Sequence, residues 1–203
     1  MLKLYSHPLS GNAYKVKLLL SFLKLNYEEI EVDLMAGEHL QPPFLALNPF
    51  GQIPVLTDGD KVLTDAQAIL VYVARAYGKE SADSWLPTDP AGLSEVTKWL
   101  STAAGEVRQG PESARLYHLF GVANINIERA NKRASFILEQ LNNLLKHQEW
   151  LACKRPTVAD VAVFPYVALA QDGQISLSAY PQVLAWIEQV KQLPGFVGMA
   201  GLA

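Results

Sequence analysis

The sequence is poor in cysteine and in clustered positive charge, and each scarcity excludes a class of protein. Cys153 is the only cysteine among 203 residues. The chain therefore has no internal disulfide, no Cys-x-x-Cys motif and no zinc site built on thiolates, and Cys153 is expected to be structural. The net charge is −3 and there is no run of lysine and arginine, so nucleic acid is not an expected partner.

Long apolar runs are absent as well. No uninterrupted apolar segment is long enough to span a bilayer. The N-terminus enters a strand pattern directly, without the charged region and apolar run of a signal peptide. We therefore expect no membrane partner, no metal, and a location in the reducing cytoplasm. Half of the residues are hydrophobic, which gives ample core for one large domain or two small ones.

The most informative stretch is 48–56, where a turn is followed by a proline that opens a short strand. Asp58-Gly59-Asp60 is a two-strand turn signal, and 61–63 is the returning strand of a hairpin. Proline cannot donate to a strand ladder, so Pro54 belongs at an edge or in a special turn. The local sequence alone favours a trans bond after Ile53. A cis bond would turn the N–H and C=O of Ile53 out of the sheet, where an extended peptide can pair with them.

The order of predicted elements divides the chain in two. Strands at 2–5 and 27–33, a helix over 14–25, the hairpin, and a helix capped by Thr64-Asp65 that ends near Tyr77 give β-α-β followed by β-β-α. Residues 37–47 are irregular or weakly helical. Residues 78–90 are polar and contain two prolines, which is typical of a linker.

Residues 91–203 show no strand pattern. Apolar residues at helical spacing predict helices over 91–120, 124–148 and 179–193, and Gly110-Pro111 can kink the first of them. Thr157 and Asp160 form a capping box before the almost wholly apolar stretch 158–170, which predicts a buried core helix. An α/β half over 1–77 followed by an all-helical half over 91–203 predicts two domains.

With this order in view, the sequence resembles the cytosolic glutathione transferases along its whole length. It is most similar to the bacterial members with a theta-like or beta-like N-terminal domain. The matches are Asn48-Pro49-Phe50-Gly51-Gln52-Ile53-Pro54-Val55-Leu56, Thr64-Asp65-Ala66-Gln67-Ala68-Ile69 and Pro156-Thr157-Val158-Ala159-Asp160. The resemblance implies a thioredoxin-like N-terminal domain with a cis bond at Pro54 and an all-α C-terminal helical domain. It also implies glutathione as co-substrate and a homodimer.

Glutathione is an anionic tripeptide, and the resemblance assigns backbone groups to hold it. Ile53, which precedes Pro54, would pair its N–H and C=O with the cysteinyl part, while its side chain is free to fill the core. Asp65 and Ala66 open a helix whose free N–H groups and positive dipole end suit the γ-glutamyl carboxylate. The Asp65 carboxylate would take the γ-glutamyl ammonium; the alternative is a simple N-cap. The family usually has serine where this chain has Ala66, and the missing hydroxyl affects affinity for glutathione most.

Two further residues are implied for the glycyl carboxylate. Gln52 adjoins Ile53. His39 stands nine residues before Asn48, as a glycyl-binding histidine does in theta-like members. The alternative for His39 is a solvated loop side chain.

The loop between the first strand and the first helix is implied to stabilise the thiolate. A helix N-terminus lowers the pKa of a nearby thiol from about 8.5 towards neutrality, and a hydroxyl or amide donor favours the charged form further. Ser10 aligns with the serine of theta-like members and the catalytic cysteine of beta-like ones, and Asn12 matches an asparagine used by some bacterial relatives. Either can also simply cap the helix. Tyr5 is a rival, but its place within a strand favours packing.

The second substrate, by resemblance, lies against the helical domain near Arg108 and Tyr117. Arg108 can instead be a surface cation, and Tyr117 can instead be a ring packed in the core. Phe50 occupies the position of an aromatic residue that some classes insert into the partner subunit. Packing of its ring on the proline loop is the favoured alternative.

Three functions stay open on the sequence. The first is a transferase that joins glutathione to small hydrophobic electrophiles. The second is a glutathione-dependent peroxidase or disulfide reductase, in which bound glutathione is the thiol, because the lack of cysteine at Ser10 and Ala13 argues against a glutaredoxin-type mechanism. The third is a binding module without turnover.

Overall fold

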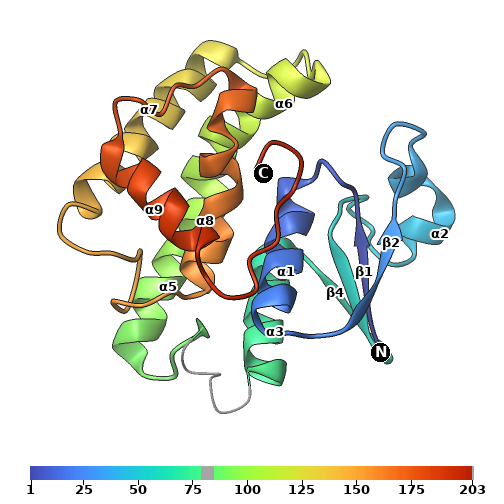
Figure 1. The fold of residues 1–203 in the computed structure, drawn as a ribbon. Helices are drawn as coiled ribbons and strands as arrows, with labels where there is room; N and C mark the ends of the chain where they lie inside the picture. Colours follow the sequence, from blue (N-terminus) through green and yellow to red (C-terminus); the bar gives the residue numbers. More distant parts are fainter. Residues whose placement is uncertain (79–84, 203) are drawn as a thin grey trace.

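The computed structural model describes residues 1–78 and 85–202 and shows a four-stranded sheet with its helices beside a bundle of longer helices (Figure 1). The sheet has the strand order β2-β1-β3-β4. β1 (Leu2–Ser6) pairs in parallel with β2 (Tyr27–Glu31) and antiparallel with β3 (Val55–Asp58), which pairs antiparallel with β4 (Lys61–Thr64). The predicted order of strands and helices in this half is confirmed.

Helices α1 (Gly11–Phe22) and α3 (Ala66–Tyr77) lie on one side of the sheet, and their apolar side chains pack with those of β1 in the core. α1 begins three residues earlier than predicted. The reason is a side-chain cap: the Ser10 hydroxyl accepts a hydrogen bond from the N–H of Ala13 at 3.1 Å. Of the two candidate thiolate donors expected in the loop, Ser10 is therefore the cap of α1, and Asn12 lies in the first turn of the helix.

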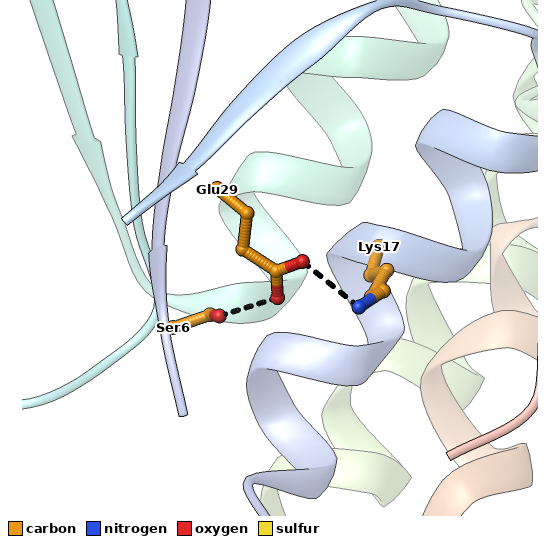
Figure 2. Close-up of polar contacts among 3 residues, drawn as sticks. All are labelled: Ser6, Lys17 and Glu29. Carbon is orange, nitrogen blue, oxygen red and sulfur yellow. Dashed lines mark hydrogen bonds and ion pairs between the residues drawn. The ribbon is translucent and has the colours of Figure 1, made fainter. Parts of the chain in front are cut away.

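One surface carboxylate joins the first two strands to α1. Glu29 Oε1 accepts a hydrogen bond from Ser6 Oγ at 2.7 Å, and its Oε2 pairs with Lys17 Nζ at 2.9 Å (Figure 2). The side chains of Lys17 and Glu29 are 36% and 37% exposed, so solvent screens this ion pair and its contribution to stability is small.

The short helices η1 (Glu38–Leu40) and α2 (Pro42–Leu45) form in the stretch that the sequence left irregular or weakly helical. Phe44 of α2 is buried with Val32 and Val55 in a small second core. The Tyr5 ring packs edge-on against Phe44, with 6.3 Å between the ring centroids. Tyr5 is therefore a packing residue, as its position in the strand indicated.

The second half of the described chain consists of helices and contains no strand. They are α5 (Pro90–Thr102), the π-helix η3 (Ala103–Glu112), α6 (Ser113–Phe120), α7 (Ile127–Leu144), α8 (Val158–Ala168), the 3-10 helix η4 (Ala170–Gly173) and α9 (Pro181–Lys191). Helices form in all four predicted regions, with ends that differ by a few residues. Within the described residues, no helix is both long and apolar enough to cross a membrane.

The helix predicted over 91–120 differs from expectation in its middle. Ten residues there are π-helical and include Gly110 and Pro111. Pro111 has no N–H for the normal α-helical bond, and the wider π turn accommodates it. A Cβ on Gly110 would lie 2.7 Å from the backbone nitrogen of Ala134 in α7, so glycine permits the close contact of these two helices. Of the linker predicted over 78–90, residues 79–84 lie outside the described residues.

Helix α8 forms the centre of the bundle, and residues 158–167 are buried. The predicted capping box is present. The Thr157 N–H donates to Asp160 Oδ2 at 2.9 Å, and the Ala159 N–H donates to Thr157 Oγ1 at 3.2 Å. Asp160 also accepts from Trp186 Nε1 at 3.1 Å. Because α8 packs against α1 and α3 as well as α5, one continuous core joins the two halves (Figure 1).

Candidate functional site

A cleft of about 580 Å³ lies between the sheet half and the helical half. The sheet side is formed by the loop before α1, the loop before β3 and the start of α3, and the helical side by η3, α6 and α8. The residues implied for substrate binding that line it are Ser10, Asn12, His39, Gln52, Ile53, Pro54, Asp65, Ala66 and Arg108. The topology thus gathers into one cleft residues that are up to 98 positions apart in the chain.

Two other residues singled out by the sequence are placed differently. Tyr117 does not belong to the lining, and its ring lies edge-on to that of His118 with 5.0 Å between centroids. Phe50 lies at the cleft but is 82% exposed. Its ring is therefore not packed on the proline loop, contrary to the alternative favoured from the sequence.

The loop before β3 presents free backbone groups. The Ile53–Pro54 bond is cis, as the resemblance implied. Within the described residues, neither the N–H nor the C=O of Ile53 makes a hydrogen bond. Buried Asn48 holds the preceding turn, because its Nδ2 donates to the Gln52 carbonyl at 2.6 Å and its Oδ1 accepts from the Phe50 N–H at 3.1 Å. An extended peptide can therefore pair with Ile53.

The start of α3 carries an unusual backbone conformation. Asp65 is the N-cap, with Oδ1 accepting from the Ala68 N–H at 2.9 Å, and it has a φ of 69°. Such a φ is uncommon outside glycine and is often found at functional sites. The cap bond does not use Oδ2, so the cap and a ligand contact are compatible. The first N–H groups of the helix have no partner inside it and suit an anion.

The start of α1 offers two side-chain donors. The Ser10 oxygen accepts the cap bond from Ala13, which leaves its O–H to donate elsewhere. The Asn12 amide is held on both sides, because its Oδ1 accepts from Lys15 Nζ at 2.8 Å and its Nδ2 donates to Glu112 Oε1 at 3.2 Å. One N–H of the amide has no partner in these contacts.

The sequence did not reveal a cluster of buried charged residues that contacts the Asn12 amide. Lys15 is fully buried, Glu112 is 6% exposed, and Tyr166 of α8 is 4% exposed. Burial lowers the pKa of Lys15 to about 8, against the opposing effect of the Glu112 charge. Burial likewise raises the pKa of Glu112, although Lys15 and Arg108 oppose it. The available signal was Lys15 itself, which stands one helical turn before Leu19 on the apolar face of α1.

Arg115 is a second buried charge that the sequence did not reveal. It is 2% exposed. Its Nε pairs with Asp172 Oδ2 at 2.8 Å, and its Nη1 donates to the Leu9 carbonyl at 2.8 Å. Arg115 therefore ties α6 and η4 to the loop that carries Ser10. Its Nη2 and His39 Nδ1 are buried and have no hydrogen-bond partner among the described residues, and both residues line the cleft.

Comparison with known proteins decides the family. Residues 1–75 match the family model "Glutathione S-transferase, N-terminal domain", and residues 123–197 match "Glutathione S-transferase, C-terminal domain". Glutathione S-transferase 3 of Zea mays is 34% identical over 96% of this chain and 91% of its own length. The chain belongs to the glutathione S-transferase family. The family resemblance noted in the sequence and the expected two-part fold are thus confirmed.

Solved structures of other glutathione S-transferases agree with this fold. The enzyme from Pseudomonas fluorescens superposes with a TM-score of 0.90 at 30% identity, covering 98% of both chains. A glutathione transferase homologue from Lodderomyces elongisporus, 25% identical over 96% of this chain and 94% of its own, has a TM-score of 0.84. The crystal structure of that homologue holds two glutathione molecules per subunit.

Proposed function

We propose that this protein is a glutathione transferase that holds glutathione as a thiolate and lets the sulfur attack a small hydrophobic electrophile. One observation carries the proposal: the free backbone groups of Ile53 and the N-termini of α1 and α3 converge on one cleft. Strand-like pairing suits the cysteinyl part of the tripeptide, and the helix ends suit its γ-glutamyl carboxylate and its thiolate. His39 and Gln52 are the proposed contacts of the glycyl carboxylate.

The chemistry follows from the start of α1. The thiol releases its proton to solvent, and the sulfur accepts hydrogen bonds from the Ser10 hydroxyl and the Asn12 amide, which favour the charged form. The thiolate then forms a bond to the electrophilic carbon, and the leaving group departs with the electron pair of the broken bond. This reaction requires no built-in general base.

The electrophile is proposed to lie on the helical side of the cleft. Leu116 and Phe120 of α6 and Ala103 of η3 line that side, together with the exposed cation Arg108. Apolar side chains suit a hydrophobic molecule, and Arg108 suits a polar substituent on it.

The test is the ultraviolet difference spectrum of bound glutathione as pH rises, together with turnover of an aryl halide. We expect a thiolate band that titrates well below the ordinary thiol pKa of about 8.5, and measurable turnover. Glutathione that binds without a thiolate band would contradict the mechanism. A chain that does not bind glutathione at all would instead be a binding module that has kept the fold.

Disulfide reduction is a second candidate, and the two glutathione molecules in the Lodderomyces homologue favour it. In this reaction the bound thiolate attacks a disulfide and forms a mixed disulfide while one thiolate leaves. A second glutathione then attacks the glutathione sulfur of the mixed disulfide, releasing oxidised glutathione and the second thiol. Arg108 would attract a carboxylate of the second molecule.

Calorimetry and substrate competition separate the two candidates. Two glutathione molecules per chain, faster turnover of a disulfide than of an aryl halide, and a several-fold rise in the disulfide KM in Arg108→Gln support reduction. One molecule per chain with aryl halide turnover supports transfer.

We also propose a homodimer in the cytoplasm, with two domains over 1–77 and 91–203 in each subunit. The exposed Phe50 is the proposed contact with the partner subunit, because an exposed ring of this size is stabilised by burial. Light scattering of Phe50→Ser against the natural chain tests the contact. An unchanged dimer would exclude Phe50 from the interface.

A further inference from the structure

The Asn12 amide lies between a group that can only donate hydrogen bonds and a group that, when ionised, can only accept them. Lys15 Nζ donates to Oδ1 at 2.8 Å, and Glu112 Oε1 accepts from Nδ2 at 3.2 Å. An ammonium has no acceptor and a carboxylate has no donor. Rotating the amide by half a turn would set Nδ2 against the ammonium and Oδ1 against the carboxylate. Both contacts would become repulsive, so the charges determine which way the amide faces.

The surroundings make this orientation strongly preferred. Lys15 and Glu112 are 0% and 6% exposed, and electrostatic interactions are stronger in such a site than in water. The Lys15 ammonium also lies over the Tyr166 ring, 5.2 Å from its centroid. Tyr166 is 4% exposed and lines the cleft beside Asn12 and Glu112. The amide is therefore held from both sides by its contacts with Lys15 and Glu112.

The two charges come from different halves of the protein. Lys15 belongs to α1 of the sheet half, one turn after Asn12, whereas Glu112 is the last residue of the π-helix η3. π-helical turns are rare in proteins overall, and many of those that occur lie at functional sites. The helical half thus contributes directly to the geometry of a donor in the sheet half.

We infer that Lys15 and Glu112 are positioning residues that hold Asn12 with its amide nitrogen, not its oxygen, towards the glutathione sulfur. The inference rests on the proposed function, because it needs a thiolate in the cleft. The N–H of Asn12 that Glu112 leaves free is the donor to the sulfur. Without the two charges, the amide would also present its oxygen, which repels a thiolate.

The alternative is that Lys15 acts on the sulfur only through its own positive charge, and a double-mutant cycle separates the two. The pKa of bound glutathione is measured in the natural chain, Asn12→Ala, Lys15→Met and the double variant. We expect Lys15→Met to raise the thiol pKa by about one unit, the size of one hydrogen bond to a charged group. In the Asn12→Ala background the same change should have almost no further effect. Equal effects of Lys15→Met in both backgrounds, or none in either, would overturn the inference.

Lys17→Met is the matched control. Lys17 lies on the same helix and pairs with Glu29 (Figure 2). It is outside the cleft and partly exposed. It should leave the thiol pKa unchanged, and an equal rise there would contradict a specific role of Lys15.

Loss of a buried charge can also prevent folding, so circular dichroism and the unfolding midpoint are measured for each variant. If Lys15→Met does not fold, Glu112→Gln tests the other contact, because it keeps the volume but removes the obligatory acceptor. It should raise the thiol pKa in the natural background and not in Asn12→Ala; any other pattern overturns the inference.

Bound glutathione without a thiolate band in the natural chain would overturn the proposed function, and the inference with it. If the natural chain shows a thiolate band but the two substitutions change the thiol pKa additively, the inference is overturned and the proposed function is not.

Discussion

The two walls of the cleft present different kinds of groups. The sheet wall, formed by the loops before α1 and β3 and the starts of α1 and α3, combines backbone groups with polar side chains. The backbone groups are the N–H and C=O of Ile53 and the first N–H groups of α1 and α3, and the side chains include Ser10, Asn12, His39 and Gln52. The helical wall offers side chains, namely the cations Arg108 and Arg115 and the apolar residues Ala103, Leu116 and Phe120. Backbone groups are positioned by the local chain conformation, whereas side chains of a helix are positioned by how that helix packs.

This difference between the walls has a chemical consequence. A wall that includes fixed backbone groups is suited to a part of the ligand that is always the same, here glutathione in the proposed function. A wall built from side chains can vary with few substitutions and is suited to the variable partner. The walls are not independent, because Arg115 and Glu112 of the helical half reach the loop and the amide of the sheet half.

The largest effect is expected where the helical wall supports the sheet wall. Arg115→Leu removes the pair with Asp172 and the bond to the Leu9 carbonyl. Breaking a buried pair from one side costs about 3 kcal/mol in the free energy of unfolding, at the lower end because Asp172 is 29% exposed. Urea unfolding of Arg115→Leu and of the natural chain measures this loss in the free energy of unfolding. The control is Arg133→Leu, whose pair with Glu106 is 40% and 34% exposed and should cost less than about 1 kcal/mol. Equal losses would mean that burial of Arg115 adds nothing.

The next effect concerns the sheet wall alone. Ser10→Ala removes the proposed hydroxyl donor to the sulfur, and loss of one preorganised donor lowers kcat/KM by about 100-fold. It also removes the N-cap of α1, at about 1 kcal/mol of stability. Steady-state kinetics with an aryl halide is the measurement. Ser6→Ala, which loses only the bond to Glu29, should keep its activity. A loss below tenfold would shift the main role to Asn12 and the helix end.

The third prediction concerns the residue at which the walls meet. The pKa of Lys15 is lowered from 10.5 to about 8 in the folded chain, so between about pH 8 and 10.5 the unfolded chain binds more protons at this residue. Stability then rises with pH, by up to about 1.4 kcal/mol per pH unit. Urea unfolding from pH 7 to 10 should show the natural chain gaining on Lys15→Met. If the difference in the free energy of unfolding between the two chains stays constant with pH, Lys15 titrates at its ordinary pKa.

The smallest expected effect tests whether the two walls bind their ligands independently. Ala66→Ser adds a hydroxyl beside the N-terminus of α3, where the γ-glutamyl carboxylate is proposed to lie. One added hydrogen bond is worth about 1 kcal/mol, so the glutathione KM should fall about fivefold. The KM of the electrophile should not change, because the helical wall is untouched. If both KM values fell together, the two walls would not act separately.

Much of the sheet wall could be predicted from the sequence. The turn after Asn48, the proline at Pro54 and the cap at Asp65 are local signals, each with a direct conformational meaning. The errors there are local: the ring of Phe50 is exposed, although packing was favoured, and one helix start is displaced. The first helix was expected to begin three residues late, although Ser10 was recognised as a possible cap, because the cap bond to Ala13 depends on backbone geometry and not on composition.

The helical wall was predicted less well. Apolar spacing located the helices, but it did not reveal the π-helical turn at 103–112. Nor did it reveal the buried charges. Lys15 and Glu112 are 97 positions apart, and no local pattern pairs residues at that distance.

By itself the sequence determined the order of elements, the capping box at Thr157, the family and the loop residues on the sheet side of the cleft, because these depend on short-range conformational preferences and on contiguous motifs. Only the tertiary structure decided that Lys15, Glu112 and Arg115 are buried against the cleft and which way Asn12 faces. The physical reason is that a buried charge is stable only beside groups that compensate it. Here α8 packs against both α1 and η3, and Lys15 and Glu112 meet at the Asn12 amide.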